Sequence, residues 1–429
     1  MSRPLAITNA RVVDPASGYD GPGAVIVAEG VVADVLRQPT PAGLTTDAEV
    51  VDAGGALLIP GLVDIRVKTG EPGFEPKETL KSAAQAAAAG GVTTVVLQPD
   101  THPVMDEPAV VDFVLRRARD IELINVYPAG AATKGCQGER MAEIGLMHDA
   151  GCLYVSDADR PIVDSKVLRR VLSYAKAFGT PVAHRPADPW LSAGAAASEG
   201  EFAARMGLPS VPAVAERIML ERDLALVELT GAPFIVDQIT TAGALETLKR
   251  GLDRGLPVTA TTSINHLSFN EIDIGDYRTF CKLDPPLRSE DDRQAVIDAV
   301  ASGLIQVIVS AHAPAPAEDK RLPYDEAAPG AVGLQTLLPA LLAFHHEGRI
   351  PLIDLIRAVT AAPAKLLGLP CGRIAKGAPA DLVLCDLDAP VVVDADRLIS
   401  KSKNSPFDGR RLQGKVLRTL VDGRTVYAP

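Results

Sequence analysis

The sequence predicts an α/β protein: a (β/α)8 TIM barrel with a small β-sandwich domain formed by the N- and C-terminal segments. Short apolar runs alternate with helical patterns through the middle of the chain, which is typical of βα units around a parallel sheet. Both ends of the chain instead hold short strand-like runs without a long helical period. Eight βα units in about 300 residues fit a barrel with insertions.

The change of pattern along the chain gives the expected domains. Residues 1–55 and 370–429 are expected to form the two parts of the β-sandwich, and residues 56–369 the barrel. Barrel strands are expected at the apolar runs 62–67, 92–97, 123–127, 153–156, 181–184, 234–237, 258–261 and 306–310. Helices are expected between most of them, at 78–89, 110–120, 165–178 and 242–254.

The composition narrows the class of protein. The formal net charge of −11 over 429 residues is unfavourable for binding nucleic acid or an anionic membrane. The sequence begins without the apolar stretch of a signal peptide, and no apolar window reaches the roughly 18 residues of a spanning helix. The five cysteines form no Cys-x-x-Cys pair, which indicates reduced thiols in the core. We therefore expect a cytoplasmic protein.

Charged residues lie at the end of the first predicted barrel strand, where barrels carry their functional groups. Because strand side chains alternate, Asp64, Arg66 and Lys68 are expected to point into the barrel mouth, and Ile65 and Val67 toward the helices. Charges that point inward need partners. Arg66 and Lys68 are therefore expected to form internal ion pairs, with anion binding as the alternative. The candidate partners are Asp64, Asp157 and Asp159.

Motifs along most of the chain resemble one known family. The segment 60–73 resembles the dihydroorotase signature Pro-Gly-x-x-Asp-x-His-x-His-x-Arg-Glu-Pro-Gly. Further resemblances follow in the family's order at 90–96, 133–135, 155–157, 285–288, 310–314, 372–374, 380–383 and 400–407. The chain is identified on these motifs as a member of the dihydroorotase family, in the amidohydrolase superfamily. The family residues that it retains are Asp64, His184, Arg288 and His312.

The resemblance implies that the metal-binding residues of active relatives have been replaced. Arg66 and Lys68 stand where two His of the first strand hold a divalent metal. Arginine has no lone pair to give, and lysine must first lose a proton. The other altered positions are Ala158, beside Asp157, for a bridging acid, Gln238 for a His, and Ala311 for the Asp that acts as general base. His184 is the ligand that survives, and it is also explained by a hydrogen-bonded core histidine.

Substrate recognition is altered as well, on the same resemblance. Gly70 takes the place of a carboxylate-binding Arg, and Asp100 that of an Asn. Asp284 replaces the Asn of the Asn-Pro-Pro-Leu-Arg motif, and Ala315 replaces a His. An acid at position 100 would repel a substrate carboxylate.

These losses lead to three hypotheses about function. The first is a non-catalytic dihydroorotase-like protein of pyrimidine biosynthesis, without zinc or another cofactor. The resemblance implies that such a chain would assemble with the catalytic chain of aspartate carbamoyltransferase, as a homo- or hetero-oligomer. The second is an active metal-dependent hydrolase of a cyclic amide, such as dihydroorotate, a hydantoin or allantoin. The third is a sensor in which Arg66 and Lys68 hold a small anion.

Overall fold

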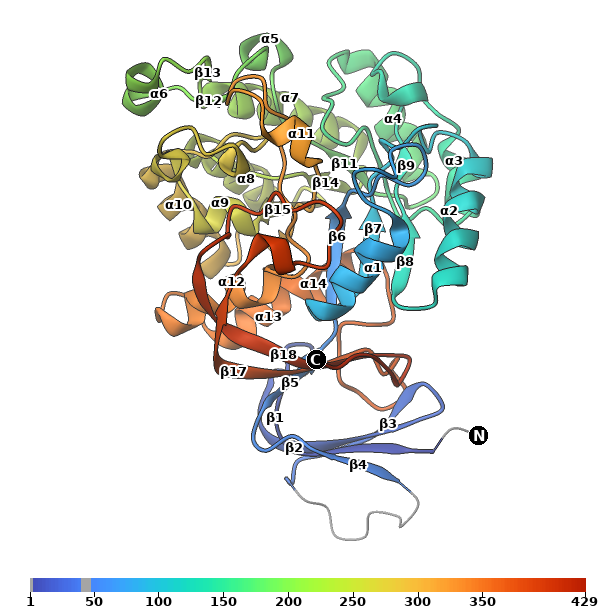
Figure 1. The fold of residues 1–429 in the computed structure, drawn as a ribbon. Helices are drawn as coiled ribbons and strands as arrows, with labels where there is room; N and C mark the ends of the chain where they lie inside the picture. The colour runs from blue at the N-terminus through green and yellow to red at the C-terminus, as the bar shows by residue number, and fades with distance from the viewer. Residues whose placement is uncertain (1–2, 40–47) are drawn as a thin grey trace.

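The computed structural model describes residues 3–39 and 48–429 (Figure 1). A barrel of parallel strands surrounded by helices lies above a β-rich layer that contains segments from both ends of the chain. The expected fold class is therefore confirmed. In the described part of the chain, no helix has the length and apolar character to cross a membrane.

Eight strand positions make up the barrel wall. They are β6 (Leu62–Val67), β7 (Val92–Leu97), β8 (Asn125–Pro128) with its continuation β9 (Gly130–Ala131), β10 (Val155–Ser156), β11 (Val182–His184), β14 (Phe234–Val236), β15 (Val258–Ser263) and β16 (Val307–Val309). Each overlaps one of the expected apolar runs. Neighbouring strands pair in parallel, and a bridge between Val67 and His312 brings the first and last strands together. The ring is closed in this way.

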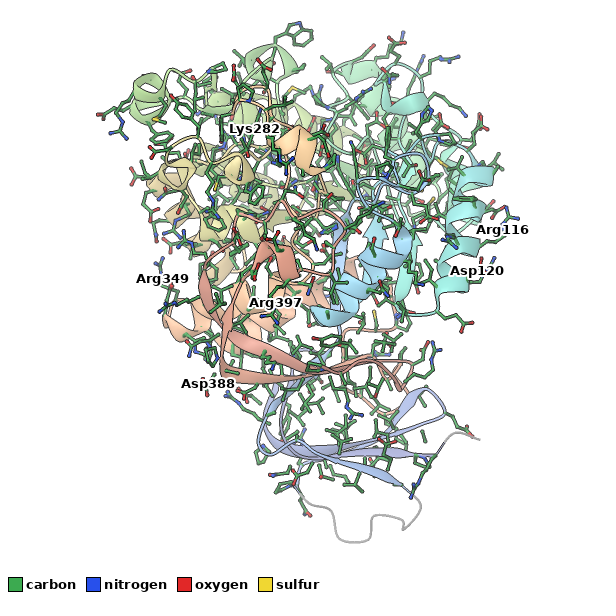
Figure 2. The ribbon with its side chains drawn as sticks, in the orientation of Figure 1. Arg116, Asp120, Lys282, Arg349, Asp388 and Arg397 are labelled. Carbon is green, nitrogen blue, oxygen red and sulfur yellow. The ribbon has the colours of Figure 1, made fainter. Side chains whose placement is uncertain are left out.

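Helices cover the outside of the barrel. They are α1 (Leu80–Ala89), α2 (Pro108–Ile121), α3 (Ile144–Asp149), α4 (Ser165–Lys176), α7 (Val214–Thr230), α8 (Ala242–Asp253), α10 (Glu290–Ala301), α12 (Leu337–His346), α13 (Leu352–Val359) and α14 (Ala361–Leu366). Helix α2 shows why such segments are helical: Val111, Val114 and Ala118 form a buried stripe at helical spacing. Arg116 and Asp120 project from its opposite face into solvent (Figure 2).

Shorter elements lie in the connections. They are α5 (Pro189–Ser192), β12 (Ala197–Ser198), α6 (Glu201–Met206), β13 (Ser210–Val211), α9 (Ile264–Ser268), α11 (Ala317–Lys320) and the 3-10 turns η1 (Lys134–Cys136), η2 (Glu271–Ile274), η3 (Thr279–Cys281) and η4 (Ala395–Arg397). Of these, α5, α6 and α11 lie at the carboxyl end of the barrel (Figure 1).

The two ends of the chain share one eight-stranded sheet. Its strands are β1 (Leu5–Asp14), β2 (Tyr19–Ala28), β3 (Val31–Leu36), β4 (Glu49–Asp52), β5 (Leu57–Pro60), β17 (Leu382–Val392), β18 (Arg411–Val421) and β19 (Arg424–Tyr427). Seven run in the order β19-β18-β17-β5-β1-β2-β3, and β4 pairs with β1. The antiparallel pair β5–β17 joins the N-terminal strands to the C-terminal ones. Since β5 lies beyond residue 55, the sheet extends past the expected limit of the first segment; the limits themselves stay predictions.

Alternating apolar side chains of β5 and β17 attach the sheet to the barrel. Leu57 and Ile59 pack in the same cluster as the barrel helices, whereas Leu58 between them packs in the sheet's own core. Val383 likewise faces the barrel, and Leu384 faces the sheet's core. Each such side chain contributes about 1.5–3 kcal/mol on burial. Both faces of the seam are therefore held by apolar contacts.

The interior of the barrel corrects one expectation about β6. Ile65 lies in a buried cluster with Ala183, Ile235 and Val309 from the other barrel strands, so it faces inward rather than toward the helices. Val67 faces the helices as expected. The pairing of β6 with β7 shifts register between Asp64 and Val67. This irregularity breaks the strict alternation and allows both Ile65 and the Arg66 side chain to reach the inside.

Candidate active site

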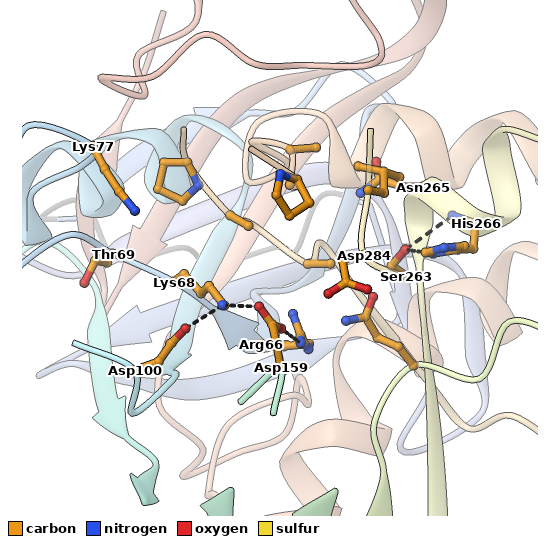
Figure 3. Close-up of a pocket in the computed structure, with 18 of the residues that line it drawn as sticks. Arg66, Lys68, Thr69, Lys77, Asp100, Asp159, Ser263, Asn265, His266 and Asp284 are labelled. Atoms are coloured by element: carbon orange, nitrogen blue, oxygen red, sulfur yellow. Dashed lines mark hydrogen bonds and ion pairs between the residues drawn. The ribbon is translucent and has the colours of Figure 1, made fainter. Parts of the chain in front are cut away.

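A cavity of about 150 Å³ opens at the carboxyl ends of the barrel strands (Figure 3). Six of the positions expected from the sequence line it: Arg66, Lys68, Asp100, Gln238, Asp284 and Ala311. The remaining ones do not line it: Asp64, Gly70, Asp157, Ala158, His184, Arg288, His312 and Ala315. The structure thus gathers six of the fourteen expected positions into one pocket, and the other eight lie outside its lining.

Arg66 is buried at the floor of this cavity and is held by two acids. Its Nε donates to both carboxylate oxygens of Asp237, at 2.9 and 2.7 Å, and its Nη2 donates to Asp159 Oδ1 at 2.6 Å. Gln238 completes the surroundings: with its amide oxygen toward the guanidinium, it accepts from Arg66 Nη2 at 3.0 Å. Arg66 therefore points away from bulk solvent. This orientation is the one that the ion-pair hypothesis requires.

Lys68 lies beside Arg66 and shares one of its partners. Its Nζ donates to Asp100 Oδ2 at 2.5 Å and also to Asp159 Oδ2 (Figure 3). Asp159 thus bridges the two cations through its two oxygens. Of the three expected partners, Asp159 is confirmed. Asp64 accepts from the backbone N–H of Arg66 and not from its guanidinium, and Asp157 instead accepts from the backbone N–H of Thr133 at 2.8 Å.

A third cation extends the network. Arg185, directly after β11, forms a two-pronged pair with Asp284, in which Nη1 donates to Oδ2 at 2.9 Å. Its Nη1 also lies 3.6 Å from Asp159 Oδ1. Asp284, which was expected only as an altered recognition residue, is therefore an ion-pair partner. This pairing favours internal compensation over anion binding for the cations at the cavity floor.

The charges in this network stabilise one another. Burial alone would raise the pKa of Asp159, but Lys68, Arg66 and Arg185 outweigh it and hold that pKa below its usual range. Burial likewise acts to lower the pKa of Arg66 and of Lys68, yet the neighbouring carboxylates raise both above their usual values. All of these groups stay charged around neutral pH, because every shift favours the ionised form.

His184 lies outside the cavity with both ring nitrogens engaged. Its Nδ1 is 2.7 Å from Asp223 Oδ2, and its Nε2 accepts from the backbone N–H of Ile162 at 2.8 Å. An acceptor role for Nε2 fixes the proton on Nδ1, which donates to Asp223. The hydrogen-bonded core histidine is the interpretation that this geometry supports.

The retained residues Asp64 and His312 lie where β6 meets the segment after β16. Asp64 accepts from the backbone N–H of Ser310, at 3.3 Å to Oδ2, and burial raises its pKa to about 6. His312 accepts from the backbone N–H of Gly333 at Nδ1, 3.1 Å away, and its Nε2 faces Glu78 at 3.7 Å. These contacts tie β6 to the segment after β16 and indicate a structural role.

Three further expected residues support loops around the mouth. Arg288 donates to Thr240 Oγ1 at 3.0 Å and lies 3.5 Å from Glu216. The backbone N–H of Ala315 donates to Asn404 Oδ1 at 3.1 Å. At Gly70 a Cβ atom would collide with the carbonyl oxygen of Phe74, so the loop as folded excludes any side chain there.

Backbone strain gathers at the strand ends around the cavity. Ala158, Gln238 and Ala311 have φ values of 54°, 60° and 50° after β10, β14 and β16, in the left-handed region. Each such non-glycine residue costs about 1–3 kcal/mol, and such strain clusters at functional sites. By the resemblance, these are three positions at which active relatives carry metal-binding side chains.

The cavity also holds residues outside the expected site, and of these only His266 stood out in the sequence, as a residue of barrel-mouth packing. Ser263 lies at the end of β15 and contacts His266 Nδ1 at 2.7 Å, while His266 Nε2 faces the carbonyl of Pro285 at 3.0 Å. Burial, with Arg288 nearby, lowers the pKa of His266 to about 3, so its ring is neutral. Asn265 and Lys77 also line the cavity. The one available signal was position, since Asp237, Arg185 and Ser263 all lie at the ends of predicted strands.

Comparisons with known proteins agree with the motifs. Residues 55–244 match the Dihydro-orotase-like family, and residues 341–427 match the Amidohydrolase family. A protein named dihydroorotase from Anaeromyxobacter dehalogenans is 42% identical over 100% of this chain and 98% of its own length. The chain belongs to the dihydroorotase family. Another dihydroorotase, from Pelobacter propionicus, is 39% identical over 99% of both chains.

Solved structures show the same fold. The L-hydantoinase (dihydropyrimidinase) from Arthrobacter aurescens superposes with a TM-score of 0.88 and 24% identity, over 100% of this chain and 96% of that one. The dihydropyrimidinase from Brevibacillus agri gives a TM-score of 0.85 at 21% identity, over 99% and 95%. At these sequence identities the likeness shows a shared fold and nothing further.

These relatives overturn the first hypothesis. The expectation of a non-catalytic protein that serves aspartate carbamoyltransferase assembly is wrong, because relatives 42% identical along the whole chain are named dihydroorotase. The expectation of no cofactor is corrected on the same ground, since dihydroorotases and hydantoinases are metal-dependent families. The error came from equating altered positions with lost activity.

The side chains at the family's metal positions nevertheless do not fit a divalent ion. Arg66 and Lys68 carry fixed positive charge, which would repel a dication. His184 has no free ring nitrogen. Within residues 3–39 and 48–429, no three His, Cys, Asp or Glu side chains are grouped so as to hold a metal. We therefore assign no chemical step to an ion at these positions.

Proposed function

We propose that this chain is a hydrolase that opens the ring of a cyclic amide, with dihydroorotate as the first substrate to test. The observation that carries the proposal is the relationship to proteins named dihydroorotase. One of them is 42% identical over 100% of this chain and 98% of its own length. The hydantoinase and dihydropyrimidinase structures share the fold and bear the names of enzymes for related rings.

The geometry of the barrel mouth supports the proposal. The cavity lies at the carboxyl ends of the strands, where enzymes with this fold place their active sites. It is lined by polar and charged side chains from several strand ends, and strained backbone surrounds it. Strain of this kind persists where a precise backbone position matters.

A ring-opening assay tests the function directly. Purified full-length protein is incubated with dihydroorotate, hydantoin or 5,6-dihydrouracil, both with zinc supplied and after treatment with a chelator, and the open-chain product is quantified by chromatography. We expect turnover of at least one of these rings. Absence of turnover with all three, in both conditions, would overturn the proposal.

A blocked cavity provides the matched control. Ala313 lines the cavity, so Ala313→Trp is expected to fill it and abolish turnover. Ala16 is exposed in a groove at the opposite end of the barrel, and Ala16→Trp is expected to leave turnover unchanged. Equal loss in both variants would indicate general damage rather than a site at the mouth.

Two expectations about cellular context stay predictions. No comparison tests association with the aspartate carbamoyltransferase catalytic chain or with further copies of this chain. Size measurement of the purified protein, alone and mixed with that catalytic chain, would decide between them. The cytoplasmic location also stays a prediction.

A further inference from the structure

Most of the charge in the cavity is already neutralised from within. Arg66, Lys68 and Arg185 are paired with Asp159 and three further acids at distances of 2.9 Å or less. A ligand anion would gain little from these cations, because their carboxylate partners hold them and oppose its charge.

Lys77 differs from the other cations of the cavity. It lies in the loop between β6 and α1, and Figure 3 shows its amine reaching toward the pocket. Among the described residues no carboxylate lies within 4 Å of its amine, and its Nζ stands 4.9 Å from the centre of the Phe74 ring. An ammonium group in this state can pair with an incoming anion without first breaking an ion pair.

Asn265 offers a hydrogen-bond acceptor, in contrast to the ammonium group of Lys77. It is 2% exposed and lines the cavity, and its Oδ1 has no hydrogen-bond partner among the described residues. Its Nδ2 faces the carbonyl of Ser310 at 3.5 Å, so the reverse orientation of the amide would bring two oxygens together. A buried acceptor without a donor is unfavourable, which makes this oxygen a ready partner for a ligand N–H.

We propose that Lys77 and Asn265 together select the ligand of this cavity, a compact cyclic amide that carries a carboxylate. Lys77 pairs with the carboxylate, and Asn265 Oδ1 accepts the ring N–H. The inference rests on the proposed function, because it names recognition groups in the same cavity. It also explains how an acidic ring is held although Gly70, Asp100 and Ala315 cannot hold it.

Binding, rather than turnover, tests this inference. Titration calorimetry compares dihydroorotate with 5,6-dihydrouracil, which has a similar ring without the carboxylate. In Lys77→Gln, dihydroorotate is expected to bind about tenfold more weakly, the loss of one charge-assisted contact, while dihydrouracil binds unchanged. Lys81→Gln removes an exposed lysine from α1 nearby and is the matched control, expected to change neither affinity.

The second residue gives an independent result. Asn265→Leu keeps the size of the side chain and removes the acceptor, so both rings are expected to bind about tenfold more weakly. Thermal melting verifies that each variant is folded; should Asn265→Leu fail to fold, Asn265→Asp takes its place, because it keeps an acceptor and should retain binding of the neutral ring.

The outcomes separate this inference from the proposed function. Turnover by the natural chain with equal affinities in Lys77→Gln would overturn the inference and leave the function standing. Carboxylate-selective binding that depends on Lys77, without turnover of any ring, would support the inference and overturn the function. No binding of dihydroorotate by the natural chain would overturn the inference.

Discussion

Arg66 stands at a position where a side chain without a partner would be costly. Its guanidinium is buried between Asp237 and Asp159, which come from segments far away in the sequence. Buried charges are tolerated when they are paired and hydrogen-bonded, and the pKa shifts of Arg66 and Asp159 both favour the charged state. The shape of the pocket therefore depends on Arg66 being present together with both acids.

Removal of Arg66 should expose this dependence. Arg66→Met leaves the buried Asp237 without its partner, so we expect the free energy of unfolding to fall by about 3–5 kcal/mol. Urea denaturation measures the change. Adding Asp237→Asn to this variant should restore part of the loss, because the stranded charge is removed.

An exposed ion pair supplies the comparison. Arg11 pairs with Asp20 at 2.8 Å, but their side chains are 42% and 33% exposed. Arg11→Met is expected to cost less than about 1 kcal/mol, since solvent screens the charges. Similar losses in Arg11→Met and Arg66→Met would contradict the view that burial makes the Arg66 network costly to break.

At the scale of elements, the strands could be predicted and most of their contacts could not. Runs such as 62–67 and 92–97 have the length and apolar character of buried parallel strands, and they fold as predicted. The partners of Arg66 could not be read in this way, since Asp237 lies 171 residues away and no local pattern links the two. The inward turn of Ile65 was missed for a related reason, because a register shift is a property of two strands and not of one.

Two loops over the barrel mouth are joined by a buried lysine. Lys320, at the end of α11, donates through Nζ to the carbonyls of Thr279 at 3.0 Å and Lys282 at 3.3 Å. Lys282 is seen beside α11 (Figure 2). Burial, with the charge of Lys282, lowers the pKa of Lys320 from its ordinary 10.5 to about 7. The folded protein therefore releases this proton more readily than the unfolded chain does.

This difference predicts a pH dependence of stability. Between about pH 7 and pH 10 the unfolded chain binds a proton that the folded protein does not, so this group makes stability rise with pH in that window. In Lys320→Met the contribution disappears. We expect the stability of the natural chain relative to the variant to increase by about 1 kcal/mol from pH 8 to pH 9, measured by urea denaturation. A constant difference would show that Lys320 keeps its proton when folded.

At the scale of the whole molecule, the terminal sheet and the barrel share a core. Leu57, Ile59 and Val383 pack with the barrel helices on one face of the seam, and Leu58 and Leu384 pack within the sheet on the other. A sheet attached on this scale should not unfold ahead of the barrel. The molecule is therefore expected to behave as one cooperative unit.

A single substitution in the sheet tests this unity. Leu420 of β18 is fully buried in the sheet's own core, so Leu420→Ala should cost about 2–5 kcal/mol. Because the long helices belong to the barrel, loss of helical circular dichroism reports barrel unfolding. We expect that signal to shift to lower temperature as a single transition, whereas the exposed Val392→Ala leaves it in place. An unchanged helical transition in Leu420→Ala would mean that sheet and barrel unfold separately.

The seam between β5 and β17 also has a consequence for how the protein is made. A ribosome releases β5 early and supplies β17, β18 and β19 only at the end of translation. Until then, β5 lacks its C-terminal neighbour, and its apolar face has no cover from that side. The nascent chain must keep this open sheet edge from pairing with other chains until the last residues emerge.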